Sequence, residues 1–389
     1  MVDTARFANS PNGHLEPLVI WHGGKESDYF GFVPDRLPDA FSLTAETTLA
    51  VSEADQALGL LEGVARMLPN TALFIRPIVR REAVSTSALE GTYAGFSEVL
   101  EAEVAQSAHP TAEVREVLNY TRTAERALVW IKSQPITLGL LQQLQAVLVA
   151  GTRGDGPDTG RFRTVPVMIG PEGAPPANAH FIPCPPGAVL EDRMRAWEEW
   201  NYRQDATTSV VRSAVSHYQF ETIHPFRDGN GRLGRLVAIL LLIARGPLSG
   251  HLFSLSPYLE ARRGEYGDLL RGVSGEGDWD SWVRFFAIGV RDQAIEAHGK
   301  AESLLRWRES TVDHIRDSGI KGSAITLCEN LIGFPVISRT QAAELADVTY
   351  RAATLAIEKL VEAGVLREAT GRTYGRLYYA PEVLAILDT

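Results

Sequence analysis

The chain has 389 residues, of which 45% are hydrophobic and 22% charged, with 34 glycines and 21 prolines. This composition excludes a largely disordered or fibrous chain, and the length predicts two or three domains at about 150 residues per domain. The formal net charge is −10, so the chain as a whole does not attract nucleic acid or anionic lipid, and any site for a polyanion must be local.

Cysteine usage and the amino terminus favour a cytoplasmic protein. Cys184 and Cys328 are the only cysteines, too few for a disulfide framework, and the start MVDTARFANS has no basic segment followed by an apolar run. The longest apolar run, Leu236 to Ala244, is far shorter than the roughly 20 residues of a membrane helix. It is expected to be a buried core helix, and no membrane partner is expected.

The amino-terminal half is expected to be irregular at first and then helical. Gly23, Gly24, Pro34 and Pro38 interrupt any period in residues 1–40, which we assign to an irregular lead-in. Residues 41–130 are expected to form a helical region. Its evidence is the three-residue spacing of Leu58, Leu61, Val64 and Met67, a second helix from Ile75 to Glu90, and Gly91 at a left-handed cap.

Residues 131–318 are expected to form an α-helical core with one inserted hairpin. The Gly- and Pro-rich stretch between Gly151 and Pro186 holds two short extended segments, GRFRTVPVMIG and HFIPCPP. Helical patterns resume from Val189. Residues 319–389 then follow the plan of a winged helix, with Ser338 capping a short helix, a turn at Asp347, a second helix that contains Leu355 and Leu360, and a small hairpin.

The stretch ETIHPFRDGNGRLGR, residues 221–235, predicts a site for a phosphate. Pro225 restricts the residue before it, so one helix should end near Ile223. The glycines of the Gly-Asn-Gly sequence permit a sharp turn before a new helix begins near Arg232. Exposed amides at the positive end of that helix would bind an anion. They belong to Gly229, Asn230 and Gly231.

The side chains of the same stretch complement such an anion. Arg232 and Arg235 are three residues apart, so both reach one flank of the helix and can pair with further phosphate oxygens. His224 is positioned to accept a proton, and Asp228 offers the hard oxygen ligand that Mg²⁺ prefers beside substrate phosphates. A plain turn, or a metal pair formed by the HxxxD spacing, would leave the two arginines unexplained.

HPFRDGNGRLGR resembles the signature HxFx[D/E]GNGRxxR of the Fic (filamentation induced by cAMP) domain family and matches every defining position. The resemblance implies a mainly α, Fic-type helical core that transfers AMP from ATP to a Ser, Thr or Tyr hydroxyl of a target protein and releases pyrophosphate. It implies that His224 deprotonates the hydroxyl, Phe226 anchors the loop, and Asp228 binds Mg²⁺ between the α- and β-phosphates. By the same resemblance the phosphates contact Gly229, Asn230, Gly231, Arg232 and Arg235. Relatives that phosphorylate carry Lys at position 231, so Gly231 favours AMP transfer.

Upstream, TSALEG, residues 86–91, is similar to the inhibitory motif [S/T]xxxE[G/N] of many Fic proteins. The resemblance implies that Glu90, in the motif that Thr86 opens, pairs with Arg235 and prevents productive placement of the γ-phosphate. A bidentate pair of this kind is strong enough to compete with a phosphate. A solvated glutamate is the plain alternative. Whether the same glutamate assists removal of AMP, as in some relatives, is left open by the sequence.

Two further segments resemble parts of the family. GRFRTVPVMIG and HFIPCPP resemble the hairpin flap beside Fic active sites, where a β-edge would hold an extended target segment. A plain surface hairpin is the alternative. LSPYLEARRGEYGDLL resembles the stretch after the catalytic helix, in which Tyr258 is expected either to contact adenine or to be a buried structural tyrosine.

The tail leaves other functions open. Its second helix would bring Tyr350 and Arg351 to a major groove, with Arg372 and Arg376 at phosphates. Residues 320–389 carry seven basic and eight acidic residues, which is unlike a strong DNA binder, so protein docking or support of a homodimer is an equal alternative. A DNA-binding regulator whose Fic core senses nucleotide, and a transferase of phosphocholine, UMP or GMP, are the two alternative functions.

Overall fold

The structure of the chain, a computed structural model, describes residues 4–68, 70–105, 110–171, 173–369 and 375–388. The chain divides into two compact units. The first consists of Met1–Gln56, Asn119–Leu248 and Leu255–Asp292, and the second of Ala57–Leu118, Ser249–Ser254 and Gln293–Thr389. The four-domain boundaries expected from the sequence stay a prediction.

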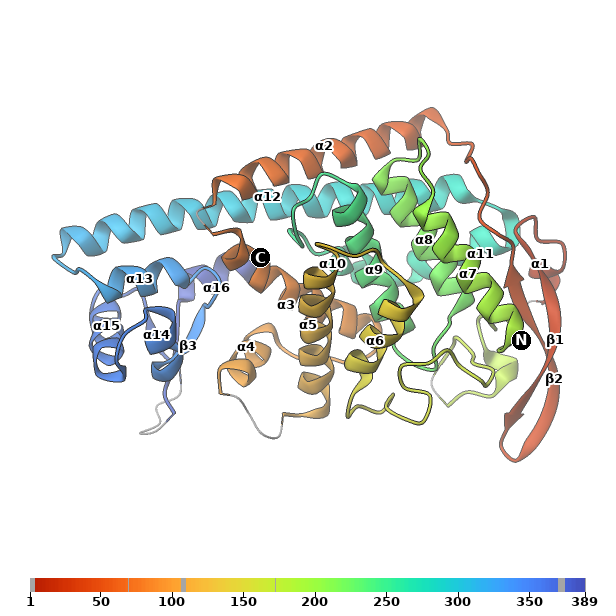
Figure 1. The fold of residues 1–389 in the computed structure, drawn as a ribbon, viewed down its shortest axis with the longest axis horizontal. Helices are drawn as coiled ribbons and strands as arrows, with labels where there is room; N and C mark the ends of the chain where they lie inside the picture. Colours follow the sequence, from red (N-terminus) through yellow and green to blue (C-terminus); the bar gives the residue numbers. More distant parts are fainter. Residues whose placement is uncertain (1–3, 69, 106–109, 172, 370–374, 389) are drawn as a thin grey trace. The chain divides into compact units, whose positions relative to one another are not determined.

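The fold is mainly α, as the sequence predicted (Figure 1). Three helices contribute residues to both units: α2 (Ala45–Met67), α5 (Ala112–Trp130) and α12 (Trp279–Asp317). The first unit also contains α1 (Thr4–Ala8), α6 (Leu138–Val149), the 3₁₀ helix η1 (Pro176–Asn178), α7 (Ala188–Tyr202), α8 (Ser209–Ile223), α9 (Asn230–Arg245), α10 (Ser256–Ala261) and α11 (Arg263–Glu276). No helix in the described part of the chain is both long enough and apolar enough to cross a membrane.

The core of the first unit is the pair α8 and α9. Every residue of α8 from Val210 to Ile223 is buried, and so is α9 from Asn230 to Leu242, which confirms the buried core helix expected around Leu236. The Ser213 hydroxyl donates to the Ala238 carbonyl at 2.7 Å and ties the two helices together. A Cβ on Gly234 would lie 2.7 Å from Glu221 Oε1, so this glycine is what lets α9 approach α8 closely.

The amino-terminal residues form a β-hairpin, so the expectation of an irregular lead-in over residues 1–40 is wrong. Strand β1 (Gly13–His22) pairs antiparallel with β2 (Lys25–Pro34) along their full length. Gly23 and Gly24 connect them with φ of +59° and +79°. Two consecutive residues with positive φ form the turn whose twist suits a two-residue hairpin. The glycines that interrupt the sequence pattern are therefore the residues that make the hairpin.

The flap expected between residues 151 and 186 is a hairpin of minimal extent. Ile169 and Phe181 form an isolated antiparallel bridge, in which the Ile169 amide donates to the Phe181 carbonyl at 2.9 Å and the His180 amide donates to the Ile169 carbonyl at 2.8 Å. The two extended segments meet there as expected, but in the described residues they form no continuous strands. Proline has no backbone N–H to donate to a neighbouring strand, and both proline and glycine favour irregular backbone.

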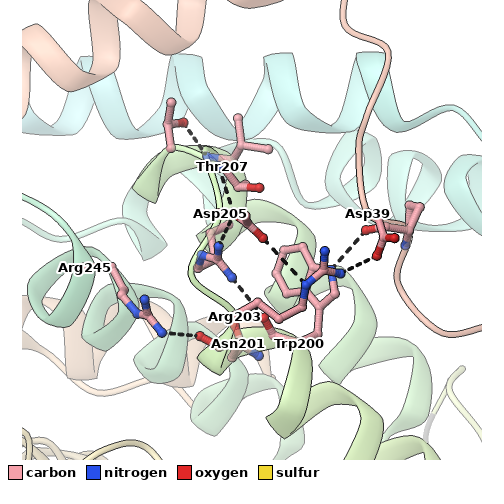
Figure 2. A network of polar contacts seen from close by, with 11 residues as sticks. Asp39, Trp200, Asn201, Arg203, Asp205, Thr207 and Arg245 are labelled. Carbon is pink, nitrogen blue, oxygen red and sulfur yellow. Dashed lines mark hydrogen bonds and ion pairs between the residues drawn. The ribbon is translucent and has the colours of Figure 1, made fainter.

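A network of charges joins the chain after the hairpin to the turn between α7 and α8 (Figure 2). Arg203 pairs with Asp39 and Asp205, and Asp205 also accepts from Arg212 Nη2 at 2.6 Å. Burial raises the pKa of Asp205, but hydrogen bonds from Thr207 and the charges of Arg212 and Arg203 hold that pKa below its ordinary value. The network fixes the point at which α8 begins.

In the second unit, α3 (Thr71–Leu89) is held to α4 (Phe96–Val104) by an ion pair between the buried Arg80 and the partly exposed Glu103. The Arg80 guanidinium donates from Nε and Nη2 to the two oxygens of Glu103, which also accepts from Arg76. Burial raises the pKa of Glu103, but the hydrogen bonds and charges of the two arginines hold that pKa below its ordinary value. The pair thus stabilises the helix that carries the TSALEG motif.

The carboxy-terminal part of the second unit contains the two successive helices and the paired strands after them that were expected, while its assignment as a winged helix stays a prediction. It contains α13 (Ser323–Asn330), β3 (Val336–Ser338), α14 (Arg339–Leu345), α15 (Tyr350–Glu362), β4 (Arg367–Glu368), β5 (Leu377–Tyr379) and a final helix α16 (Pro381–Asp388), with sheet order β3-β5-β4. Ser338 caps α14 as predicted. Leu355, expected in helical register with the core, is exposed. Arg372 lies outside the described residues.

Candidate active site

The predicted phosphate loop lies between α8 and α9. Helix α8 ends at Ile223 as expected, and α9 begins at Asn230, two residues before the expected start near Arg232. His224 follows α8 in the left-handed region, with φ 53° and ψ 62°, and its amide donates to the Phe220 carbonyl. A left-handed conformation at a non-glycine residue costs about 1–3 kcal/mol and tends to occur at functional sites. Here it falls on the predicted general base.

The surroundings of His224 determine which ring nitrogen can accept a proton. Nδ1 lies 3.2 Å from the Glu221 carbonyl oxygen. A carbonyl only accepts, so Nδ1 donates in this hydrogen bond and the neutral ring carries its lone pair on Nε2. The Glu221 carboxylate lies 3.9 Å from the same Nδ1. The ring is therefore arranged to accept a proton at Nε2.

The amino terminus of α9 has the open geometry that the predicted anion site requires. The residue at its N-cap, Gly229, has φ +84° and no side chain to cap the helix. A Cβ there would lie 3.1 Å from Leu148 Cδ2 of α6, so packing as well as backbone conformation requires glycine. The first amides of a helix have no intrahelical acceptor and sit at the positive end of its dipole. Phosphate binding by the amides of Gly229, Asn230 and Gly231 stays a prediction.

Side chains inside the loop hold its shape. The Phe226 amide donates to Asn230 Oδ1 and Asn230 Nδ2 donates to the Phe226 carbonyl, both at 2.8 Å. Phe226 is fully buried, with its ring 5.5 Å from that of Phe162, so it anchors the loop as expected. The sequence predicted a role for the backbone amide of Asn230 alone. In the structure its side chain also closes the turn, and its amide belongs to the first residue of α9.

Asp228 and Arg232 form an ion pair at the entrance to the loop. Arg232 Nη2 lies 3.2 Å from Asp228 Oδ1, and the side chains are 1% and 29% exposed. Gln145 Nε2 donates to the Asp228 carbonyl at 3.1 Å. The one partly exposed carboxylate fits a Mg²⁺ site in which substrate phosphates supply most ligands. The described residues contain no group of three or more His, Cys, Asp or Glu that could hold a metal alone.

Arg235 is buried beside a neutral histidine. Burial, together with the charge of Arg235, lowers the pKa of His217 to about 3. His217 Nε2 lies 2.8 Å from the Tyr266 hydroxyl. The neutral imidazole therefore adds no second positive charge beside Arg235. His224 and Asp228 lie on the loop between α8 and α9, and Arg232 and Arg235 lie on α9.

Arg163, which the sequence analysis did not single out, holds the loop to the flap. Its Nε donates to the His224 carbonyl at 2.8 Å, its Nη2 donates to the Cys184 carbonyl at 2.6 Å, and its amide donates to the Pro225 carbonyl at 2.9 Å. The side chain is buried, and burial lowers the pKa of the guanidinium. The sequence offers only a weak signal, because Arg161 and Arg163 stand in the same segment and nothing in the chain distinguishes the buried one.

The TSALEG motif, residues 86–91, lies at the end of α3 in the second unit. Thr86 is fully buried, and Glu90 is the exposed C-cap whose amide donates to the Ser87 carbonyl at 2.9 Å. Gly91 has φ +83°, which confirms the left-handed cap. Arg235 belongs to the first unit, and pairing of Glu90 with it stays a prediction.

Tyr258 is held by packing. Its ring lies 5.1 Å from that of Phe285 and 4.1 Å from the Arg262 guanidinium. A Cβ on Gly289 would lie 2.6 Å from Tyr258 Cδ1, so the ring fills a space that α12 leaves open. These contacts support the structural alternative considered for Tyr258, and its contact with adenine stays a prediction.

Both regions of the chain that carry motifs match models of known protein families. Residues 48–129, which include Thr86 and Glu90, match the family model described as Fic/DOC family N-terminal. Residues 135–242, which include the whole loop from His224 to Arg235, match the model described as Fic/DOC family.

Individual relatives agree with these matches. The chain is 30% identical over 223 residues to Protein adenylyltransferase Fic of Culex quinquefasciatus, a match that covers 56% of this chain and 39% of that protein. It is 26% identical over 286 residues to Protein adenylyltransferase Fic of Aedes aegypti, and this match covers 72% of this chain and 48% of that protein. The matches span less than half the length of these relatives. A crystal structure of a Fic family protein from Desulfovibrio desulfuricans G20 has the same fold, with TM-score 0.57, 21% identity, and coverage of 88% of this chain and 98% of that one.

Proposed function

Because the chain belongs to the Fic/DOC family, we propose that it is a protein adenylyltransferase that moves AMP from ATP to a hydroxyl side chain of a target protein. The observation that carries the proposal is the position of His224. His224, whose neutral imidazole carries its lone pair on Nε2, opens the loop that leads to the start of α9, a helix terminus that has no capping side chain. A base beside an anion site is what transfer of a phosphate-linked group to a hydroxyl requires.

In the proposed reaction, the target hydroxyl oxygen forms a bond to the α-phosphorus of ATP while the bond from that phosphorus to the pyrophosphate oxygen breaks. The hydroxyl proton passes to His224 Nε2, and pyrophosphate leaves with the electron pair of the broken bond. Base assistance of this kind contributes about 10²- to 10⁴-fold to the rate. The carboxylate of Glu221, 3.9 Å from Nδ1, stabilises the imidazolium that forms.

The other loop residues position the nucleotide. The amides at the start of α9 receive phosphate oxygens, and Arg232 and Arg235 pair with the β- and γ-phosphates. Asp228 would hold Mg²⁺, which when bound neutralises charge on the phosphates. For Asp228 to do so, its contact with Arg232 Nη2 at 3.2 Å must loosen, which frees the guanidinium for phosphate at the same time.

The decisive experiment incubates wild-type and His224→Ala protein in a cell lysate with ATP labelled at the α or at the γ position. We expect wild-type protein to transfer α-label alone, and His224→Ala to lose at least about 10²-fold of that transfer while it binds ATP with unchanged affinity by calorimetry. Transfer of γ-label would show a kinase. Undiminished α-labelling by His224→Ala would remove the base from the mechanism.

Control by the second unit belongs to the same proposal. Glu90 lies at the exposed end of α3, behind a left-handed Gly91. The Thr92 hydroxyl donates to Glu116 Oε2 at 2.9 Å and anchors the chain just after this cap to α5. A carboxylate presented in this way can compete with the γ-phosphate for Arg235. Low basal activity, a cytoplasmic location and assembly as a homodimer are further expectations of this proposal, whereas removal of AMP by the same site stays open.

A further inference from the structure

The hairpin of β1 and β2 has an exposed apolar face. Along β1 burial alternates, with Leu18 and Ile20 buried while Trp21 is 68% and Val19 50% exposed. Residues two apart in a strand share a face. The outer face defined by this alternation and by the strand register consists of Pro17, Val19, Trp21, Glu26, Asp28 and Phe30. Contiguous apolar side chains of this kind indicate an interaction surface rather than single exposed residues.

The charges on the outer face have one sign. Glu26 lies opposite Trp21 and Asp28 lies opposite Val19, whereas Lys25 and His22 pair with each other on the inner face. Within the described residues, neither Glu26 nor Asp28 takes part in an ion pair. Carboxylates among apolar side chains complement a segment that alternates Lys or Arg with apolar residues. The Trp21 ring can in addition stack on a cationic group.

The inner face fixes the hairpin to the returning segment of the flap. Leu18 and Ile20 form a buried cluster with Ala179 and Ile182. The Phe32 amide donates to the Ile182 carbonyl at 2.9 Å. Gly31 permits this approach, because a Cβ there would lie 2.5 Å from the carbonyl oxygen of the next residue, Pro183.

The same flap segment is tied to the predicted base. Arg163 donates from Nη2 to the Cys184 carbonyl and from Nε to the His224 carbonyl, at 2.6 and 2.8 Å. Hairpin, flap and His224 therefore belong to one continuous hydrogen-bonded structure within the first unit.

We propose that the outer face is a docking surface for the target protein, and that it recognises a segment in which Lys or Arg alternates with apolar side chains. The proposal rests on the proposed adenylyltransferase function. Main-chain hydrogen bonds at the flap select no particular sequence, so a neighbouring face with fixed charge and apolar side chains can supply the preference for a target.

The first test measures the initial rate of α-label transfer to lysate proteins as the lysate is diluted. We expect Trp21→Ser with Phe30→Ser, and separately Glu26→Lys with Asp28→Lys, to reduce transfer about tenfold at low lysate concentration and to approach wild type at high concentration. ATP affinity should be unchanged in both. Val129→Ser, which removes a side chain 70% exposed on α5, is the matched control and should label as wild type. Wild-type rates for both double variants would overturn the proposal.

The second test does not depend on transfer, so it separates failure of docking from failure of the proposed function. A photo-crosslinking amino acid replaces Trp21 in the full chain, and crosslinked products in lysate are compared with and without Glu26→Lys and Asp28→Lys. Products with other proteins that disappear on charge reversal support docking of a basic segment. Products that persist after charge reversal, or that contain only a second copy of this chain, overturn it. If wild-type protein crosslinks in this charge-dependent way but transfers no α-label, the adenylyltransferase proposal is refuted and the docking proposal is not.

Discussion

At the scale of single residues, the site depends on side chains that hold the backbone of the loop. Arg163 places a buried guanidinium among carbonyls of the flap and of the loop, including those of His224, Cys184 and Ile223. Carbonyls left without a donor in the interior cost about 1–3 kcal/mol each. The left-handed backbone of His224 therefore persists because its carbonyl has a fixed, charged donor.

We expect Arg163→Met to lower the free energy of unfolding by about 3 kcal/mol, because it removes the donor of several buried carbonyls at once. Transfer of α-label should fall more than ATP affinity, since the position of His224 is lost while the start of α9 is kept. Urea unfolding and calorimetry measure the two effects. Arg161→Met is the control, because Arg161 is exposed in the same segment. Equal effects of the two substitutions would contradict the role of Arg163.

Gly229→Ala should weaken ATP binding about tenfold and lower the free energy of unfolding by about 1–2 kcal/mol. A backbone φ of +84° is unfavourable for alanine, and the added Cβ would lie 3.1 Å from Leu148 Cδ2. Gly24→Ala imposes the same backbone strain at φ +79° with no atom within 4 Å, and it should leave ATP affinity unchanged. A parallel loss of ATP affinity in both variants would mean that Gly229 acts through stability alone.

At the scale of elements, the ends of helices carry the chemistry. The amino terminus of α9 has no side-chain cap, and the carboxyl terminus of α3 presents Glu90 before the left-handed Gly91. The ion pair of Arg80 with Glu103 keeps α3 on α4. The motif is thus carried on a rigid helix, so that substitution at its end changes the presented charge without disturbing the fold of the unit.

Glu90→Gly should raise α-label transfer about tenfold or more, because removal of one charge-assisted pair worth about 1.4 kcal/mol frees Arg235 for the γ-phosphate. Initial rates at matched ATP concentration measure the effect. Glu101→Ala, which removes an exposed glutamate of α4 in the same unit, should leave the rate unchanged. An unaltered rate for Glu90→Gly would exclude autoinhibition by this residue.

At the scale of the whole molecule, each unit contains a buried histidine that folding keeps neutral. Burial lowers the pKa of His217 in the first unit to about 3 and that of His251 in the second to about 4. The unfolded chain has a histidine pKa of about 6.5. Between these values the unfolded state binds more protons, so the free energy of unfolding falls as pH falls from about 6.5.

We therefore expect acid to destabilise the protein from below about pH 6.5, with a slope of up to about 1.4 kcal/mol per pH unit for each of the two histidines. Urea unfolding between pH 7 and about pH 5 measures the slope. His251→Gln should reduce this slope by the contribution of one titrating histidine, whereas substitution of the exposed His14 should leave the slope unchanged. A slope unaffected by His251→Gln would contradict the neutral state of that side chain.

The sequence by itself determined the loop from His224 to Arg235, the helix that follows it and the left-handed Gly91. These features depend on residues close together in the chain, on helix periodicity and on the conformations that Gly and Pro allow, all of which one sequence displays. It also contains the signal for the amino-terminal hairpin, because Gly23 and Gly24 stand between two segments with alternating apolar residues, but two adjacent glycines are equally typical of an irregular segment.

Only the tertiary structure decided which distant residues complete the site. Arg163 reaches the carbonyl of His224 from 61 residues away, Gly234 is required because Glu221 lies against it, and Tyr258 fills space beside Gly289. Such contacts arise when separately formed elements pack, and neither periodicity nor spacing in the chain encodes them. The outer face of the hairpin became visible in the same way, because the packing of Leu18 and Ile20 on the flap decides which side of the strands stays exposed.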